Sequence, residues 1–161
     1  MHIRNAPLLN LEQAAVWAAE QRAANRVVVF TNGVYDLVHP GHVQYLQAAR
    51  AEGDRLIVAV NSDRSVRANK GPSRPILPEH ERAELISALT CIDAVLIFDD
   101  ETPAAVIAAI QPDVLVKGAD WAHDAIVGRD VVESRGGRVV RMQLALGYST
   151  TGIVEIVKRL S

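Results

Sequence analysis

The sequence predicts an α/β protein in which a parallel sheet is covered by helices on both faces. Short β-branched runs alternate along the chain with segments that carry helical spacing or helix caps. The run Val27–Thr31 has no polar interruption, which is typical of a strand buried on both faces, and Leu56–Val60 is expected to be another. A chain of 161 residues is long enough for one domain with its own core, and no linker divides it.

Local signals place the elements in chain order. Asn10 caps a first helix with Gln13 three residues on, and residues 1–25 are expected to form an N-terminal helical extension. Pro78 fits the first turn of a later helix, and Gly53 ends an earlier one. The expected strands are 27–31, 56–60, 94–98, 114–116 and 138–142, and the expected helices are 10–24, 43–52, 78–89, 102–110 and 153–160. Residues Leu11, Ala14, Ala15 and Trp17 are expected to pack the first helix on the body.

Composition excludes several classes of function. The net charge is −2, so no large basic surface for nucleic acid is implied. No apolar stretch has membrane-spanning length, and the N-terminal MHIRNAPLLN lacks the pattern of a secretory signal. The single cysteine, Cys91, forms no internal disulfide and lies in an apolar run expected in the core. A cytoplasmic location is therefore expected, with no membrane and no nucleic-acid partner.

Two histidines flank a Pro-Gly pair in His39-Pro40-Gly41-His42, after the run VVVFTNGVYDLV. Residues three apart share a helical face, and a helix start favours phosphate. Gly41 removes a side chain where a phosphate could approach the backbone. One capping histidine and one core histidine would be the simpler interpretation for a lone pair. A zinc site is a second alternative, but the remaining histidines, His2, His80 and His123, form no ligand pattern.

A basic segment follows the second strand, from Arg64 to Arg74. It is expected to be a mobile loop, either a solvated surface or a lid whose cations reach phosphate on closing. Lys70, next to Gly71, is the best single candidate for that contact, and Arg64 the solvated member. In the following helix, Arg82 is either a surface partner of nearby glutamates or a functional cation, and the residues alone favour neither.

Two further motifs follow strands and so fall at the same sheet edge. Ser149-Thr150-Thr151 comes after Gly147, where hydroxyls cap a helix, bind phosphate, or divide the two roles. Lys117-Gly118-Ala119-Asp120-Trp121 ends with an aromatic ring that either stacks on a base or covers the core.

These motifs together resemble one family. The chain is similar to the HxGH nucleotidyltransferases, which include cytidylyltransferases for small phosphates. The motifs that carry the resemblance are TNGVYDLVHPGH, VNSDRSV, KGPSRPI, ERAELISAL, VLVKGADW and STTGIV. The resemblance runs from about Arg26 to the C-terminus. It is closest to the adenylyltransferase domain of the bifunctional heptose kinase/adenylyltransferase of lipopolysaccharide synthesis. It implies a Rossmann-like, doubly wound parallel sheet in a single domain.

The resemblance also implies roles for particular residues. ATP would enter with Mg²⁺, and a sugar phosphate oxygen would attack its α-phosphorus, releasing pyrophosphate. The implied catalytic residues are His39, His42, Lys70 and Arg82; the nucleotide-binding residues are Val34, Tyr35, Gly41, Gly118, Asp120, Trp121, Gly147, Ser149, Thr150 and Thr151; and the sugar-phosphate-binding residues are Asp36, Asn61 and Arg74. No dedicated metal site is expected in the protein itself.

Two departures refine the expectation. Glycerol-phosphate cytidylyltransferases place RTEG before the serine-threonine motif, whereas this chain has Leu144-Ala145-Leu146-Gly147. The sugar kinase domain of the bifunctional enzyme does not precede the motifs here, so a separate kinase is expected to supply the phosphosugar. The expected function is heptose 1-phosphate adenylyltransferase, as a homodimer. The alternatives are a polyol-phosphate cytidylyltransferase, acting for example on glycerol 3-phosphate, and an inactive nucleotide-sensing module.

Overall fold

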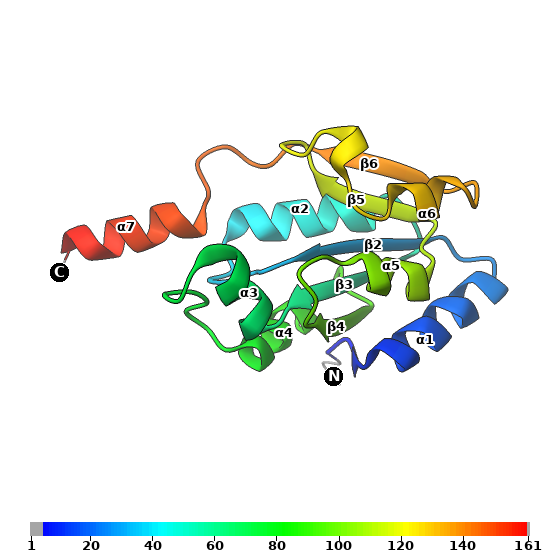
Figure 1. Ribbon diagram of the computed structural model, residues 1–161, viewed down its shortest axis with the longest axis horizontal. Coiled ribbons are helices and arrows are strands. Elements are labelled where there is room, and N and C mark those ends of the chain that lie inside the picture. The colour runs from blue at the N-terminus through cyan, green and yellow to red at the C-terminus, as the bar shows by residue number, and fades with distance from the viewer. Residues whose placement is uncertain (1–4, 161) are drawn as a thin grey trace.

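The computed structural model describes residues 5–160, in which six parallel strands form one sheet of order β1-β4-β3-β2-β5-β6 (Figure 1). Residues 1–4 and 161, and with them His2 and the start of the expected N-terminal extension, lie outside the described residues. The strands are β1 (Leu8–Leu9), β2 (Val28–Gly33), β3 (Arg55–Asn61), β4 (Ala94–Phe98), β5 (Val114–Gly118) and β6 (Arg138–Met142). The strand order reverses between β2 and β5, and ligands bind at such switch points in open α/β sheets.

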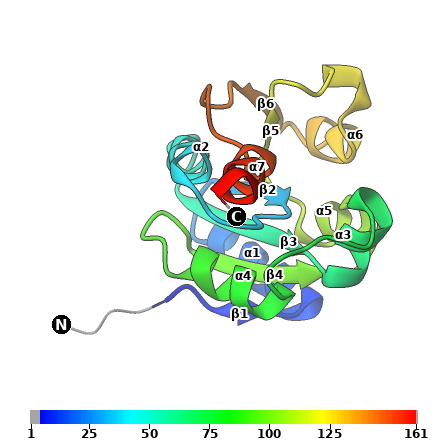
Figure 2. The same ribbon diagram turned by 90° about the vertical axis from the view of Figure 1, so that its left-hand side faces the viewer.

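Helices cover both faces of the sheet, as expected (Figure 2). They are α1 (Leu11–Ala23), α2 (Pro40–Arg50), α3 (Asp63–Lys70), α4 (Glu79–Ser87), α5 (Ala104–Ile110), α6 (Arg129–Glu133) and α7 (Thr150–Leu160), with a short 3₁₀ helix η1 (His123–Ala125). One apolar cluster joins α1, α5 and α6 to one face of the sheet, and the other joins α2 and α4 to the opposite face. Successive β2 residues alternate between the clusters, Val28 and Phe30 in one and Val29 in the other.

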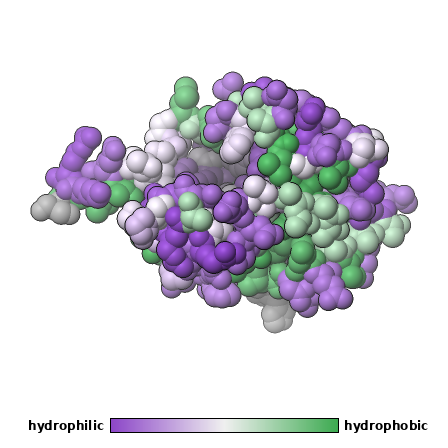
Figure 3. All heavy atoms as spheres, viewed as in Figure 1, coloured by the Kyte–Doolittle hydropathy of each residue, from purple (hydrophilic) through white to green (hydrophobic). Residues whose placement is uncertain are grey.

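The strand predictions are confirmed, with β4 and β6 at the predicted limits. The prediction of a loop from Arg64 to Arg74 is wrong, because most of this segment belongs to helix α3. Ser62 caps this helix by accepting a hydrogen bond from the Ser65 backbone N–H, and Ser65 and Val66 are its buried residues. A short helix with so small a buried face carries almost no apolar periodicity. The surface over α3 is accordingly hydrophilic (Figure 3).

The two ends of the chain differ from expectation. Strand β1 was not predicted, and its Leu8 pairs with Val95 of β4 at the edge of the sheet. Helix α1 buries Ala14 and Ala18, whereas Leu11 is exposed rather than packed on the body. Helices η1 and α6 were not predicted either. At the other end, α7 projects from the body (Figure 1), and none of its described residues is buried.

The remaining helix limits shift by a few residues. Helix α2 begins at Pro40 and ends at Arg50, so it contains the Pro-Gly pair and stops before Gly53. Pro78 is the N-cap of α4 rather than part of its first turn, and Leu89 lies beyond the helix end. Cys91 is half-buried against the cluster that contains α2 and α4. Within residues 5–160, the longest apolar helical segments fall short of what a bilayer crossing needs.

Candidate active site

A pocket lies at the carboxyl ends of β2 and β5, where the sheet order reverses. Its walls are formed by four further segments: the loop after β2, the start of α2, the end of α3 and the segment before α7. Its lining residues are Asn32, Gly33, Val34, Tyr35, His39, Gly41, His42, Tyr45, Asn61, Lys70, Arg74, Lys117, Gly118, Asp120, Trp121, Leu144, Ala145, Tyr148, Ser149, Thr150 and Thr151. The structure therefore brings most of the predicted site residues to one cavity.

His39 and His42 form the N-terminal cap of α2. The Nδ1 atom of each ring accepts a hydrogen bond of 3.4 Å from the backbone N–H of the other. The rings are stacked, with centroids 3.8 Å apart. A neutral imidazole that accepts at Nδ1 carries its proton on Nε2, so this pattern assigns an Nε2–H donor to each ring. Two donors on one helix start suit an anionic ligand.

Both imidazoles favour the neutral form in the free protein. Burial, with smaller contributions from His39 and the Lys70 ammonium, lowers the pKa of His42 to about 4. Burial also lowers the pKa of His39. Lys70, at the end of α3, lines the same pocket as the histidine pair. Its role in phosphate binding stays a prediction.

Gly41 is needed for packing. A Cβ at this position would lie 2.9 Å from Cβ of Tyr148 and 3.1 Å from the His39 ring. Real side chains do not approach so closely without a shift of their neighbours. The absence of a side chain between the histidines therefore lets the segment before α7 lie against the start of α2.

The predicted hydroxyl motif opens α7. Ser149 Oγ accepts a 2.9 Å bond from the Gly152 backbone N–H, which is the capping role. Thr150 Oγ1 donates a 2.6 Å bond to the carbonyl oxygen of Asp36. Thr151 is exposed and lines the pocket. Gly147 is not among the lining residues; its φ of +86° makes the turn before the motif.

The structure does not support a direct contact of Asp36 with a sugar phosphate. Asp36 is buried and lies outside the pocket lining. Its carboxylate accepts bonds from Arg74 Nε at 2.8 Å and from the backbone N–H groups of Ile76 and Leu77 at 2.8 and 3.0 Å. Burial raises the pKa of Asp36, but these hydrogen bonds outweigh burial and lower it. Asp36 therefore anchors Arg74, which does line the pocket with Asn61.

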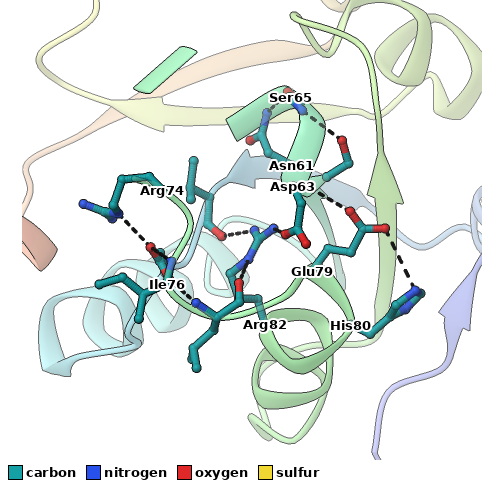
Figure 4. A network of polar contacts seen from close by, with 12 residues as sticks. Asn61, Asp63, Ser65, Arg74, Ile76, Glu79, His80 and Arg82 are labelled. Carbon is teal, nitrogen blue, oxygen red and sulfur yellow. Dashed lines mark hydrogen bonds and ion pairs between the residues drawn. The ribbon is translucent and has the colours of Figure 1, made fainter. Parts of the chain in front are cut away.

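Arg82 is a second correction. Its side chain is fully buried and lies outside the pocket lining, so it reaches neither a phosphate nor the surface glutamates. The guanidinium donates to Leu77 O at 2.9 Å, Val34 O at 2.6 Å and Asp63 Oδ1 at 2.9 Å (Figure 4). Arg82 thus connects the loop after β2 to the first turn of α3. Arg82 therefore lies behind the pocket wall and holds together two of the segments that line the pocket.

The end of β5 supplies the last wall. Gly118 leaves room for Asp120, whose Oδ1 would lie 2.5 Å from a Cβ there. Trp121 is 51% exposed, so it does not cover the core. Asn32, Lys117 and Tyr148 also line the pocket, and no individual role was predicted for them. Asn32 and Lys117 end neighbouring parallel strands, and that shared position is the signal that would have found them.

The pocket offers little to hold a metal ion on its own. Within residues 5–160 no three histidine, cysteine or acidic side chains gather closely enough to bind one. Asp120 is the one carboxylate side chain among the lining residues. A divalent cation at this site would need oxygen ligands from a bound phosphate.

Comparisons with known proteins identify the family. A model of the cytidylyltransferase-like family matches residues 30–156. The bifunctional protein HldE of Gluconobacter oxydans is 54% identical over 91% of this chain, and that of Syntrophotalea carbinolica is 53% identical over 84%. The chain spans only 31% and 28% of the length of these two relatives.

A solved structure agrees with these matches. The lipopolysaccharide core biosynthesis protein from Thermoplasma volcanium is 29% identical, with a TM-score of 0.64 over 74% of this chain and 98% of that one. The region matched by the family model, residues 30–156, contains the histidine pair, Lys70, the end of β5 and the start of α7. The chain belongs to the cytidylyltransferase-like family.

Proposed function

We propose that the protein transfers AMP from ATP to D-glycero-D-manno-heptose 1-phosphate, giving ADP-heptose and pyrophosphate. The observation that carries nucleotidyl transfer is the stacked histidine pair at the N-terminus of α2, with Lys70 close to His42 in the same pocket. Imidazole N–H donors, an ammonium group and a helix start all stabilise negative charge that develops on a phosphoryl group. Heptose as the acceptor is supported by the identity to the HldE proteins and by the likeness to a lipopolysaccharide core biosynthesis protein.

The proposed reaction is a direct displacement. An oxygen of the sugar phosphate attacks the α-phosphorus of ATP in line. The bond from that phosphorus to the oxygen that bridges to the β-phosphate breaks, and its electron pair leaves with pyrophosphate. No covalent intermediate with the protein is needed, so the protein contributes positioning and charge neutralisation.

The pocket residues divide this work. His39 and His42 donate from Nε2 to oxygens of the transferred phosphoryl group, and Lys70 offsets its charge. Thr151, which lines the pocket, and the first backbone N–H groups of α7 bind the β- and γ-phosphates in this proposal. Mg²⁺ would be held by triphosphate oxygens with Asp120 as the one carboxylate among the lining residues, and it would neutralise phosphate charge.

One feature favours ATP and heptose over a cytidylyltransferase reaction on a polyol phosphate. Leu144 lines the pocket in the segment where the glycerol-phosphate enzymes, by resemblance, carry an arginine. The pocket thus has an apolar wall in place of a cation on that side. The intact histidine pair and Lys70 disfavour the inactive sensing module, because a sensor does not need groups that act on a transition state.

The function is tested by measuring pyrophosphate release. ATP, CTP, GTP and UTP are each supplied with heptose 1-phosphate, and separately with glycerol 3-phosphate. We expect rapid release only with ATP and heptose 1-phosphate. Release with CTP and glycerol 3-phosphate would favour the cytidylyltransferase, and nucleotide binding without release in any pair would favour the sensing module. A separate kinase remains part of the proposal as the source of the phosphate that the acceptor carries, because the curated relatives are bifunctional.

A further inference from the structure

Lys117 is a pocket cation to which the proposed reaction has so far given no role. It lies near the end of β5, and the register of β2 and β5, with Phe30 opposite Leu115, brings Asn32 opposite Lys117. The ammonium group donates a hydrogen bond to Asn32 Oδ1. It also lies 6.0 Å from the centre of the Trp121 ring. Both neighbours line the same pocket.

The surroundings of this ammonium do not neutralise it. Its contacts within the described residues are a neutral amide and an aromatic ring, and no carboxylate there forms an ion pair with it. Burial lowers the pKa of Lys117 to about 8, and the more distant Asp120 opposes this only in part. A cation withdrawn from water without an anionic partner costs free energy. An anion in the pocket would remove that cost.

The sheet topology places Lys117 opposite Lys70. Helix α3, which ends at Lys70, follows β3, and Lys117 belongs to β5; these strands flank β2 on its two sides. The histidine helix follows β2 itself. Lys70 and Lys117 therefore line the pocket of the histidine pair from elements that stand on the two sides of β2.

We propose that Lys117 is a substrate-binding residue whose ammonium group contacts a phosphate oxygen of the reacting substrates, so that the reacting phosphates are held between Lys117 and Lys70. This inference rests on the proposed function and deepens it. The anionic oxygen belongs either to the nucleotide triphosphate or to the attacking sugar phosphate. Asn32 orients the ammonium towards that oxygen through its side-chain carbonyl.

The competing explanation is that Lys117 only packs against Trp121 and holds the end of β5. The two explanations predict opposite changes in melting temperature when Lys117 is replaced. Removal of a packing group lowers the melting temperature, whereas removal of a half-buried, unneutralised charge leaves it unchanged or raises it. They also differ in ligand response, because only an anion-binding lysine is needed for stabilisation by a phosphate ligand.

The test compares Lys117→Gln, Lys117→Arg and, as a matched control on the exposed face of α7, Lys158→Gln. Melting temperatures are measured with and without inorganic tripolyphosphate. For Lys117→Gln we expect an unchanged or higher melting temperature without ligand, loss of most of the tripolyphosphate-induced rise, and about a hundredfold fall in kcat/KM. Lys117→Arg should keep the ligand response, and Lys158→Gln should match the wild type. A lower melting temperature with normal kcat/KM in Lys117→Gln, or equal losses in the Gln and Arg variants, would overturn the inference.

The kinetic parameters identify which phosphate Lys117 contacts. A raised KM for ATP assigns the contact to the triphosphate, and a raised KM for heptose 1-phosphate assigns it to the attacking phosphate. A fall in kcat alone assigns it to the transferred group. The proposed function fails separately: if no nucleotide supports pyrophosphate release but tripolyphosphate still stabilises the wild type and not Lys117→Gln, Lys117 binds phosphate in a protein with another activity.

Discussion

Replacement of the buried Arg82 by methionine is expected to destabilise the fold strongly. Methionine keeps an unbranched apolar stem but is shorter than arginine and removes every donor. The carbonyl oxygens of Val34 and Leu77 then lose hydrogen bonds of 2.6 and 2.9 Å, and Asp63 loses its ion-pair partner. Buried acceptors left without a donor cost about 1–3 kcal/mol each. Asp63 retains contact with water, so its loss adds less.

The total agrees with the cost of breaking a buried pair from one side, about 3–5 kcal/mol. For a domain of this size, that loss corresponds to a fall in melting temperature of about 6–20 °C. Urea unfolding followed by circular dichroism measures the free energy, with Arg64→Met as the matched control. Arg64 makes its ion pair with Asp99 on the surface, and such pairs contribute at most about 1 kcal/mol.

The stability of Arg82→Met with and without ATP, together with its KM for ATP, distinguishes two roles for Arg82. If Arg82 holds the wall from behind, Arg82→Met lowers stability whether or not ATP is present. Normal stability together with a raised KM for ATP would refute this reasoning and restore the phosphate contact that the sequence suggested.

Three further outcomes are expected. His42→Ala should lower turnover by about two to four orders of magnitude while changing ATP affinity much less, as single-turnover kinetics and equilibrium binding can establish; near-normal turnover would remove His42 from the mechanism. Lys70→Ala should impair kcat, whereas Arg64→Ala should leave it unchanged, and equal kcat values in the two variants would contradict the placement of α3. Acid should destabilise the wild type more than His42→Gln. The pKa of His42 is about 4 in the folded protein and about 6.5 in the unfolded chain, so the unfolded chain gains a proton first as the pH falls, and stability declines between these values. An equal loss of unfolding free energy in the two proteins between pH 7 and pH 4.5 would refute the assignment.

Much of the fold could be predicted from local pattern. The strand Ala94–Phe98 is an apolar run, and Arg138–Met142 carries a β-branched pair between two arginines, so both are visible in the sequence. Helix α3 could not be predicted, because its stability comes from a serine cap and two buried residues rather than from an apolar stripe. The two-residue strand β1 is too short to carry a pattern and exists only through its pairing with β4.

The site divides along a similar line. His39 and His42 could be placed in the pocket because they begin a helix that follows a strand. Lys70 could be placed there because it is a cation next to Gly71 in the basic segment after the next strand. Arg82 and Asp36 could not be placed correctly. A charged residue in a helix or loop gives no sign of burial, and each is buried here because distant backbone groups complete its hydrogen bonds. The expected homodimer stays a prediction, which light scattering can test.

The choice of nucleotide tests the central claim most directly. The protein is given equal concentrations of ATP and CTP with limiting heptose 1-phosphate, and the sugar nucleotide products are resolved by mass. A pocket that hydrogen-bonds one base leaves polar groups unpaired with the other, so we expect ADP-heptose to exceed CDP-heptose by at least about a hundredfold. CDP-heptose as the main product, or no sugar nucleotide at all, would contradict the assignment of the protein as a heptose 1-phosphate adenylyltransferase.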